Sequence, residues 1–136
     1  MAYKELEYMD LCTIIDLDNQ IVDEDTGEVS YDVICENLPC DFQPNTTENY
    51  KGVLVQNNPT LYLPYDFEYS DKLSVNIEIL VSRYRKGGAA EIVYPDDYKT
   101  MPKEKHLVKF QIEDWQEVNV RNKLVGIEIE LREVTS

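Results

Sequence analysis

The sequence predicts an all-β protein, a small antiparallel β-barrel or sandwich with one long inter-strand loop. Residues 73–81 alternate between apolar and polar side chains except at Leu80, as a strand with one buried face does. Other short β-prone runs follow one another along the chain, separated by turn residues, and no stretch has the pattern of a long helix. The 136 residues are enough for a hydrophobic core, so we expect a single domain over 1–136.

The first third of the chain predicts an arm followed by a hairpin. Residues 1–10 fit neither the helical nor the strand period, and we interpret them as an N-terminal arm. The run 11–17 predicts a buried strand. Residues 21–35 predict a hairpin, because Gly27 can adopt a positive φ and its acidic neighbours favour turns. Cys40 is expected to begin a separate strand.

The middle of the chain predicts two short strands, at 53–55 and 61–64, before three aromatic residues at alternate positions. These residues, Tyr65, Phe67 and Tyr69, are interleaved with acidic side chains. A stacking platform for single-stranded nucleic acid would have basic residues there instead. We therefore expect the three aromatics in the core or in a subunit contact.

The strand at 73–81 is expected at the centre of the sheet, and two more strands are predicted at 108–112 and 125–131. Turns are predicted at 113–116 and at 121–123. In the central strand, the core face would carry Leu73, Val75, Ile77, Ile79 and Val81, and the solvent face Ser74, Asn76, Glu78 and Ser82.

The net charge of −14 is concentrated in the first third of the chain. Residues 1–50 hold 13 acids and one base, a net of −12, whereas 51–136 hold 14 acids and 12 bases, a net of −2. Such a surface can simply be solvated, or it can repel nucleic acid or meet a basic partner. Simple DNA binding is disfavoured, because it needs clustered Lys and Arg. With no membrane-length apolar run and no signal-peptide pattern at the start, we expect a cytoplasmic protein without membrane contact.

The sequence predicts neither an enzyme nor a cofactor or metal site. A Ser-His-Asp arrangement would have to use His106, the only histidine, and the motifs of serine hydrolases and zinc proteases are absent. The three cysteines, Cys12, Cys35 and Cys40, lack the paired spacing of a zinc site. We expect them to be small apolar side chains in or near the core.

The segment 83–109 has a clear positive excess, with seven bases against four acids. We expect 83–106 to form a long loop that projects from the domain, since a long insert between strands often carries function. The candidate partner or channel residues are Arg83, Arg85, Lys86, Gly87, Gly88, Lys99, Lys103 and Lys105.

The order of features resembles a known family. A hairpin with an acidic Gly turn leads to Leu38-Pro39-Cys40, then to Leu61-Tyr62-Leu63-Pro64 and Asp71-Lys72-Leu73-Ser74-Val75, and a charged loop precedes the closing strand. Over residues 11–136 this is similar to the head-completion proteins of long-tailed bacteriophages, also described as head-closure, stopper or minor capsid proteins.

The resemblance implies a β-barrel subunit of a homo-oligomeric ring, with a dodecamer as one candidate stoichiometry. The ring would lie at the head–tail junction of a virion assembled in the host cytoplasm, between the portal–adaptor proteins and the tail proteins. It would close the DNA-filled head and dock the tail, and the loop at 83–105 would project into the channel. Packaged DNA would pass without sequence-specific binding.

Two alternatives stay open. One is a tail-terminator or another tail-tube component. The other, from a different class, is an acidic protein that mimics DNA phosphates and inhibits a DNA-binding enzyme. A mimic would carry an acidic stripe and act as a monomer or dimer, whereas a connector would form rings. The basic excess at 83–109 speaks against mimicry.

Overall fold

The computed structural model describes residues 8–44, 46–74 and 76–134, without the side chains of 46–50 and 54–57. Of the N-terminal arm expected over 1–10, residues 1–7 lie outside the described part of the chain. The strands are β1 (Asp10–Val22), β2 (Val29–Gln43), β3 (Thr46–Tyr50), β4 (Val53–Asn57), β5 (Thr60–Pro64), β6 (Ile77–Ser82), β7 (Leu107–Val120) and β8 (Lys123–Glu133). Between β6 and β7 lies α1 (Asp96–Thr100), and two 3₁₀ turns, η1 (Ser70–Lys72) and η2 (Lys103–Lys105), complete the described elements. None of the described helices is long and apolar enough to cross a membrane.

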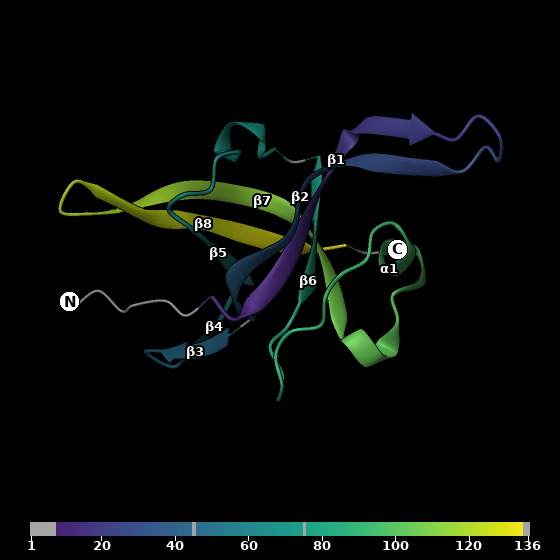
Figure 1. Ribbon diagram of the computed structural model, residues 1–136. Helices are drawn as coiled ribbons and strands as arrows, with labels where there is room; N and C mark the ends of the chain where they lie inside the picture. The colour runs from purple at the N-terminus through teal and green to yellow at the C-terminus, as the bar shows by residue number, and fades with distance from the viewer. Residues whose placement is uncertain (1–7, 45, 75, 135–136) are drawn as a thin grey trace.

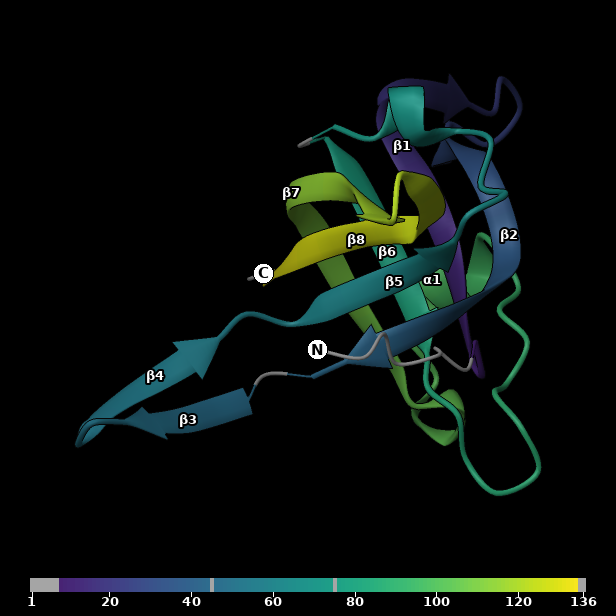
Figure 2. The same ribbon diagram turned by 90° about the vertical axis from the view of Figure 1, so that its left-hand side faces the viewer.

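Six strands pair in the order β1-β2-β5-β8-β7-β6, and β6 returns to β1, so the sheet closes on itself (Figure 1). Every pair is antiparallel, which confirms the predicted all-β class. The ring is not a regular barrel. β2 meets β5 only over 41–43, and register shifts interrupt the β1–β2 and β7–β8 pairs. Strands β3 and β4 form a separate hairpin that extends away from the ring (Figure 2).

The inside of the ring is the hydrophobic core, to which each of the six strands contributes. In β8 the alternation is as predicted, since Ile127, Ile129 and Leu131 are buried in the core cluster and the residues between them are less buried. Each strand of the ring has at least one residue in the core cluster. Examples, in chain order of the strands, are Cys12, Phe42, Leu61, Ile79, Phe110 and Ile129.

The central strand differs from its prediction in length and in burial. β6 begins at Ile77 rather than at 73. η1 ends at Lys72, and the N–H of Ile77 donates to the carbonyl oxygen of Ser74 at 3.3 Å, so a turn precedes the strand. Val75 lies outside the described residues. Every residue of β6 is buried. Glu78 and Ser82, expected in solvent, are 7 % and 0 % exposed, so that expectation is wrong. A polar face can be buried here because part of the β6–β7 connection lies against the outside of the sheet.

Two other local expectations are corrected, and a third is confirmed. Cys40 does not begin a strand, since β2 continues through it after a bend at Asn37, whose φ is 49°. Residues 113–116 belong to β7, which absorbs an irregularity between Ile112 and Asp114 instead of ending. The turn expected at 121–123 is present as a tight hairpin between β7 and β8.

The aromatic series 65–69 is not a core element as a whole. Phe67 packs against the core and meets Tyr69 edge to face at 5.9 Å between ring centroids. Tyr65 and Tyr69 are exposed, because this stretch forms turns rather than a strand. The side chains of 65–69 therefore do not alternate between a buried and an exposed face, as those of a strand would.

Candidate functional site

The connection between β6 and β7, expected as one projecting loop over 83–106, divides into two parts. The first part, 83–88, is exposed throughout and is called the basic loop below. The second part, 91–105, contains α1 and η2, holds two buried residues, and is called the anchored segment. Figures 1 and 2 both show the chain running away from the ring after β6 and then returning toward α1.

The basic loop reverses its direction at two glycines. Gly87 and Gly88 have φ values of 98° and 110°, a region that side chains rarely adopt. The N–H of Gly88 donates to the carbonyl oxygen of Arg85 at 2.7 Å, which closes the turn. A Cβ at either glycine would meet nothing within 4 Å, so backbone conformation rather than space calls for glycine here.

Asp10 fixes the base of the basic loop to the ring. Its Oδ1 accepts a hydrogen bond from the N–H of Tyr84 at 2.6 Å, and its Oδ2 accepts one from the N–H of Phe42 at 2.8 Å. The guanidinium of Arg83 lies over the ring of Phe42, 5.3 Å from its centroid. Arg83 is therefore held against the barrel, which leaves Arg85 and Lys86 as the basic residues at the end of the loop.

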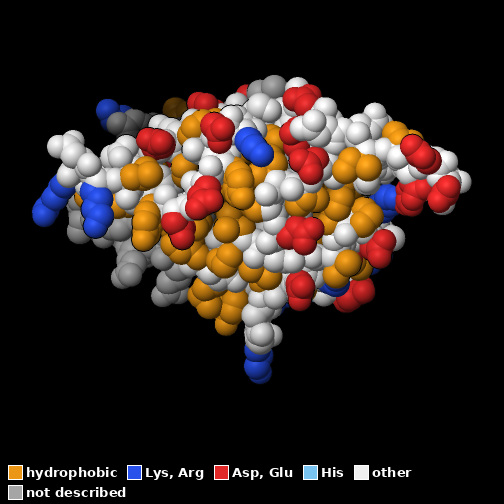
Figure 3. Space-filling view, turned by 45° about the horizontal axis from the view of Figure 1, so that its top comes forward, with side chains coloured by type: hydrophobic (Ala, Val, Ile, Leu, Met, Phe, Trp, Pro, Cys, Tyr) orange, Lys and Arg blue, Asp and Glu red, His pale blue; other side chains and the backbone are white. Residues whose placement is uncertain are grey.

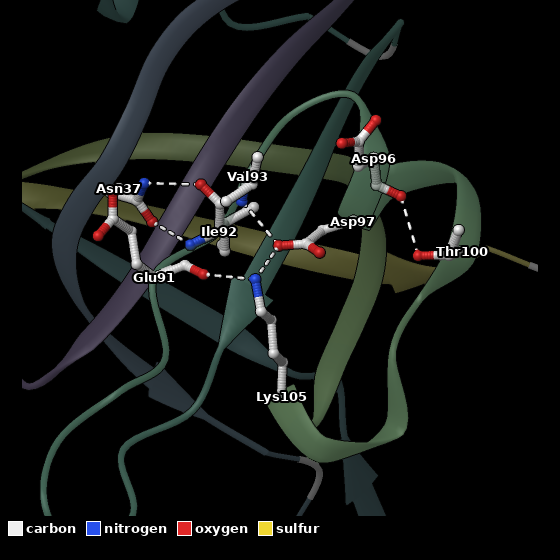
Figure 4. A network of polar contacts seen from close by, with 8 residues as sticks. All are labelled: Asn37, Glu91, Ile92, Val93, Asp96, Asp97, Thr100 and Lys105. Carbon is white, nitrogen blue, oxygen red and sulfur yellow. Dashed lines mark hydrogen bonds and ion pairs between the residues drawn. The ribbon is translucent and has the colours of Figure 1, made fainter.

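Asn37 fixes the return of the chain onto the outside of β2 (Figure 4). Its side-chain amide donates to the carbonyl oxygen of Ile92 at 2.8 Å and accepts from the N–H of Ile92 at 2.7 Å. The amide thus imitates the two hydrogen bonds of a paired strand residue. Ile92 itself is buried but is not part of the inner core cluster.

A buried carboxylate holds the anchored segment together (Figure 4). Asp97 Oδ2 accepts from the N–H of Val93 at 2.7 Å and from Lys105 Nζ at 2.6 Å, and Lys105 also donates to the carbonyl oxygen of Glu91 at 3.1 Å. Burial raises the pKa of Asp97, but the hydrogen bonds from Lys105 and Val93 outweigh burial, so the net pKa lies below the ordinary value.

A tyrosine of α1 covers the polar face of β6. The hydroxyl of Tyr98 donates to Glu78 Oε2 at 2.6 Å, and Lys109 Nζ lies 3.9 Å from the centroid of the Tyr98 ring. Burial and, next, the Glu78 carboxylate raise the pKa of Tyr98. The hydroxyl of Tyr94 accepts from the N–H of Tyr31 at 2.8 Å, which adds a contact to β2. These contacts satisfy the buried Glu78 and the hydroxyl of Tyr98, whereas the buried hydroxyl of Ser82 has no hydrogen-bond partner among the described residues.

The eight predicted site residues do not form one surface. The basic loop contains Arg83, Arg85, Lys86, Gly87 and Gly88. Lys105 pairs with Asp97, and Lys99 pairs with Glu28 of the β1–β2 hairpin, so both hold the anchored segment in place. Lys103 lies exposed in η2. Five of the eight residues therefore lie together in 83–88, and two of the others are held in ion pairs.

Sequence reasoning missed the residues that build the support of the loop, Asn37, Glu78, Asp97 and Tyr98. Asp97 falls within the loop expected to project over 83–106, and Glu78 falls on the face of the central strand expected in solvent. Asn37 carried a usable signal, since Asn is among the few residues that tolerate positive φ. The partners of Asn37, Ile92 and its neighbours, lie 55 residues further along the chain, and no local pattern points to them.

The cysteines lie in or near the core, as predicted. Cys12 and Cys40 are buried and Cys35 packs against the core, and all three are free thiols. The hydrogen bond with Cys40, and then burial, raise the pKa of Cys12, and burial raises the pKa of Cys35 to about 11. Protonated thiols are poor nucleophiles and poor metal ligands. Among the described residues, no group of His, Cys, Asp and Glu side chains is arranged to hold a metal ion.

Comparisons with protein-family models, with curated proteins and with solved structures found no match to this chain.

Proposed function

We propose that this protein is a non-enzymatic structural subunit of a phage head–tail junction, where a ring of copies closes the DNA-filled head and receives the tail. The observation that carries the proposal is the basic loop. It presents Arg85 and Lys86 at an exposed turn of a molecule whose net charge is −14, and its support is fixed to the ring at Asp10 and Asn37.

The charge distribution suits a channel through which DNA must pass. An acidic wall repels phosphates, so DNA does not adhere along the channel. A few bases that reach into the channel can still contact phosphates, and a ring multiplies each contact by the number of subunits. A loop on a rigid base can be held at one depth in the channel, which a fully flexible loop cannot.

The hairpins that leave the ring also support an assembly role. The β3–β4 hairpin and the far ends of the β1–β2 and β7–β8 pairs are two-stranded ribbons (Figures 1 and 2). A two-stranded ribbon has marginal stability on its own in water. Packing against neighbouring subunits or virion proteins would stabilise such ribbons.

The test is to change Arg85 and Lys86 to Ser in the same chain and to assemble particles with it. We expect folded subunits that still enter particles, and heads that lose DNA or fail to join tails. Nuclease protection of the packaged DNA measures retention, and electron microscopy counts joined tails.

The matched control is Lys103→Ser, which removes an exposed base from the same connection but outside the basic loop. It should retain DNA and join tails as the unchanged protein does. Normal retention and normal tail joining with the Arg85→Ser, Lys86→Ser chain would refute the proposed role of the loop.

One observation favours a second candidate, an inhibitor that mimics DNA phosphates. Residues 16–32 contain seven acids and no Lys or Arg. A mimic would act as a monomer or dimer and would compete with DNA for a basic protein. Native mass spectrometry separates the two candidates, since only the connector requires a larger assembly.

A further inference from the structure

The two ends of the molecule carry opposite charge. The β1–β2 hairpin over 16–32, called the acidic ribbon below, contains seven acids and no base. The end of the β7–β8 hairpin over 118–126, called the β7–β8 tip, contains Arg121 and Lys123 and no acid. The hairpins point to opposite sides in Figure 1, and Figure 3 shows Asp and Glu at one extremity and Lys and Arg at the other.

Among the residues that the structure describes, these charges are only slightly neutralised. In the acidic ribbon, Glu28 pairs with Lys99, while Asp23 accepts hydrogen bonds from backbone N–H groups of its own turn. The carboxylates of Glu24 and Asp25 make no ion pair with any residue that the structure describes. At the other end, the side chains of Arg121 and Lys123 are exposed, and neither forms an ion pair within the described part of the chain.

Both ends also present apolar side chains. Val22 and Val29 are opposite each other in the acidic ribbon and are 55 % and 37 % exposed, which makes an apolar patch on one face. In the β7–β8 tip, Val118 and Val120 are half-buried, and Val120 is paired with Lys123. Each end therefore combines a small apolar face with one sign of charge, which is the composition of a specific protein contact.

Beyond its base, neither ribbon has a third strand beside it among the strands that the structure describes. β6 accompanies β1 only as far as Asp16 and accompanies β7 only as far as Gln111. Beyond these points one edge of β1 and one edge of β7 leave the ring and lack a neighbouring strand among those the structure describes. Open edges and exposed valines are features that a partner would cover.

We propose that the acidic ribbon of one copy of this chain binds the β7–β8 tip of a second copy, so that the protein associates with itself head to tail. The two complementary surfaces lie on different parts of the chain, so the contact is heterologous. Repetition of a heterologous contact closes a ring or extends a filament. The biological role of this contact rests on the proposed function, but the contact itself is tested with the purified chain alone.

Two charge-reversed chains test the proposal. Glu24→Lys with Asp25→Lys makes two positions at the turn of the acidic ribbon basic and changes the net charge of 16–32 from −7 to −3. Arg121→Glu with Lys123→Glu makes the β7–β8 tip acidic, so that both ends of that chain are acidic. We expect each chain alone to associate with itself about 10-fold or more weakly than the unchanged protein, because like charges then meet at the contact. Sedimentation velocity and native mass spectrometry measure the association.

An equal mixture of the two reversed chains is the decisive sample. The lysines introduced at the turn of one chain's ribbon can pair with the glutamates introduced in the tip of the other chain. The unchanged acidic ribbon fits the unchanged basic tip, so the mixture should assemble with alternating subunits. Recovery in the mixture also shows that both reversed chains fold. High salt should weaken assembly of the unchanged protein and of the mixture alike.

The control is Asp66→Lys with Glu68→Lys, which changes the net charge as the reversed ribbon does but at a different exposed site. It should associate as the unchanged protein does. A mixture that stays monomeric, reversed chains that associate normally, or an unchanged chain that is monomeric at high concentration would each overturn the proposal. If the mixture assembles while basic-loop variants retain DNA in particles, the contact stands and the proposed function fails.

Discussion

The basic loop and the anchored segment are neighbours in the sequence, yet they differ in almost every physical respect. The basic loop, 83–88, is exposed and holds three bases and no acid. The anchored segment, 91–105, holds four acids and three bases, and two of those bases form ion pairs. Bases that have acids within reach become structural contacts. Bases without such neighbours stay available to a partner.

The comparison also shows how a chain with few apolar residues can be fixed on a sheet. Ile92 is one of the two buried residues of the anchored segment, and the other is Asp97. Hydrogen bonds of Asn37, Asp97 and Tyr98 contribute to the remaining attachment, together with the contact of Tyr94 with Tyr31 and the ion pair of Lys99 with Glu28. A segment held mainly by polar contacts is sensitive to single substitutions, because each lost partner leaves another group unsatisfied.

The largest effect is expected for Ile92→Ala. Ile92 is 3 % exposed, so its truncation should lower the free energy of unfolding by about 2–5 kcal/mol. The adjacent change Val93→Ala is the control, since Val93 is 49 % exposed and should cost less than about 0.5 kcal/mol. Chemical denaturation of both variants gives the two numbers. Equal losses would mean that the segment is not packed as described.

A smaller loss is expected for Asp97→Ala. This change removes the acceptor of Lys105 and of the Val93 N–H, and we expect a cost of about 1.5–3 kcal/mol. Asp96→Ala is the matched control from the same helical turn, because the side chain of Asp96 is exposed. Hydrogen exchange should show faster exchange over 91–105 for Asp97→Ala only. Similar exchange in both variants would assign the buried pair no anchoring role.

The pH dependence of stability should reveal the same carboxylate. The pKa of Asp97 is lower in the folded protein than in the unfolded chain, so its contribution is fully present above the unfolded pKa of about 4. That contribution is lost as the pH falls through the folded value. The stability difference between the unchanged protein and Asp97→Asn should therefore shrink below about pH 4. A difference that stays constant down to pH 2 would contradict the lowered pKa.

The smallest effects on stability are expected in the basic loop. Arg85→Ser and Lys86→Ser should each change the free energy of unfolding by less than about 0.5 kcal/mol, since both side chains are exposed. Arg83→Ser should cost about 0.5–1 kcal/mol, because it removes the contact over Phe42. Thermal unfolding of the three variants checks the order. A larger loss at Arg85 than at Arg83 would show that the end of the loop is also packed.

By itself the sequence determined the local features of this protein. The alternation in 125–131 predicted which side of β8 faces the core, and Gly27 predicted the turn between β1 and β2. The all-β class followed from such patterns, because strand period and turn chemistry depend on residues close together in the chain. The sequence also predicted the basic connection as the candidate site, and two of its eight residues, Lys99 and Lys105, form ion pairs in the structure.

Only the tertiary structure decided which polar groups are buried and which bases are free. Glu78 is buried because Tyr98, 20 residues later, lies over it, and Asn37 meets Ile92 across 55 residues. Lys105 is an anchor rather than a partner-binding base because folding brings it to Asp97. No period in a strand encodes such contacts. They depend on which outer face of the sheet a distant segment covers, and this is settled by packing and by satisfying buried polar groups together.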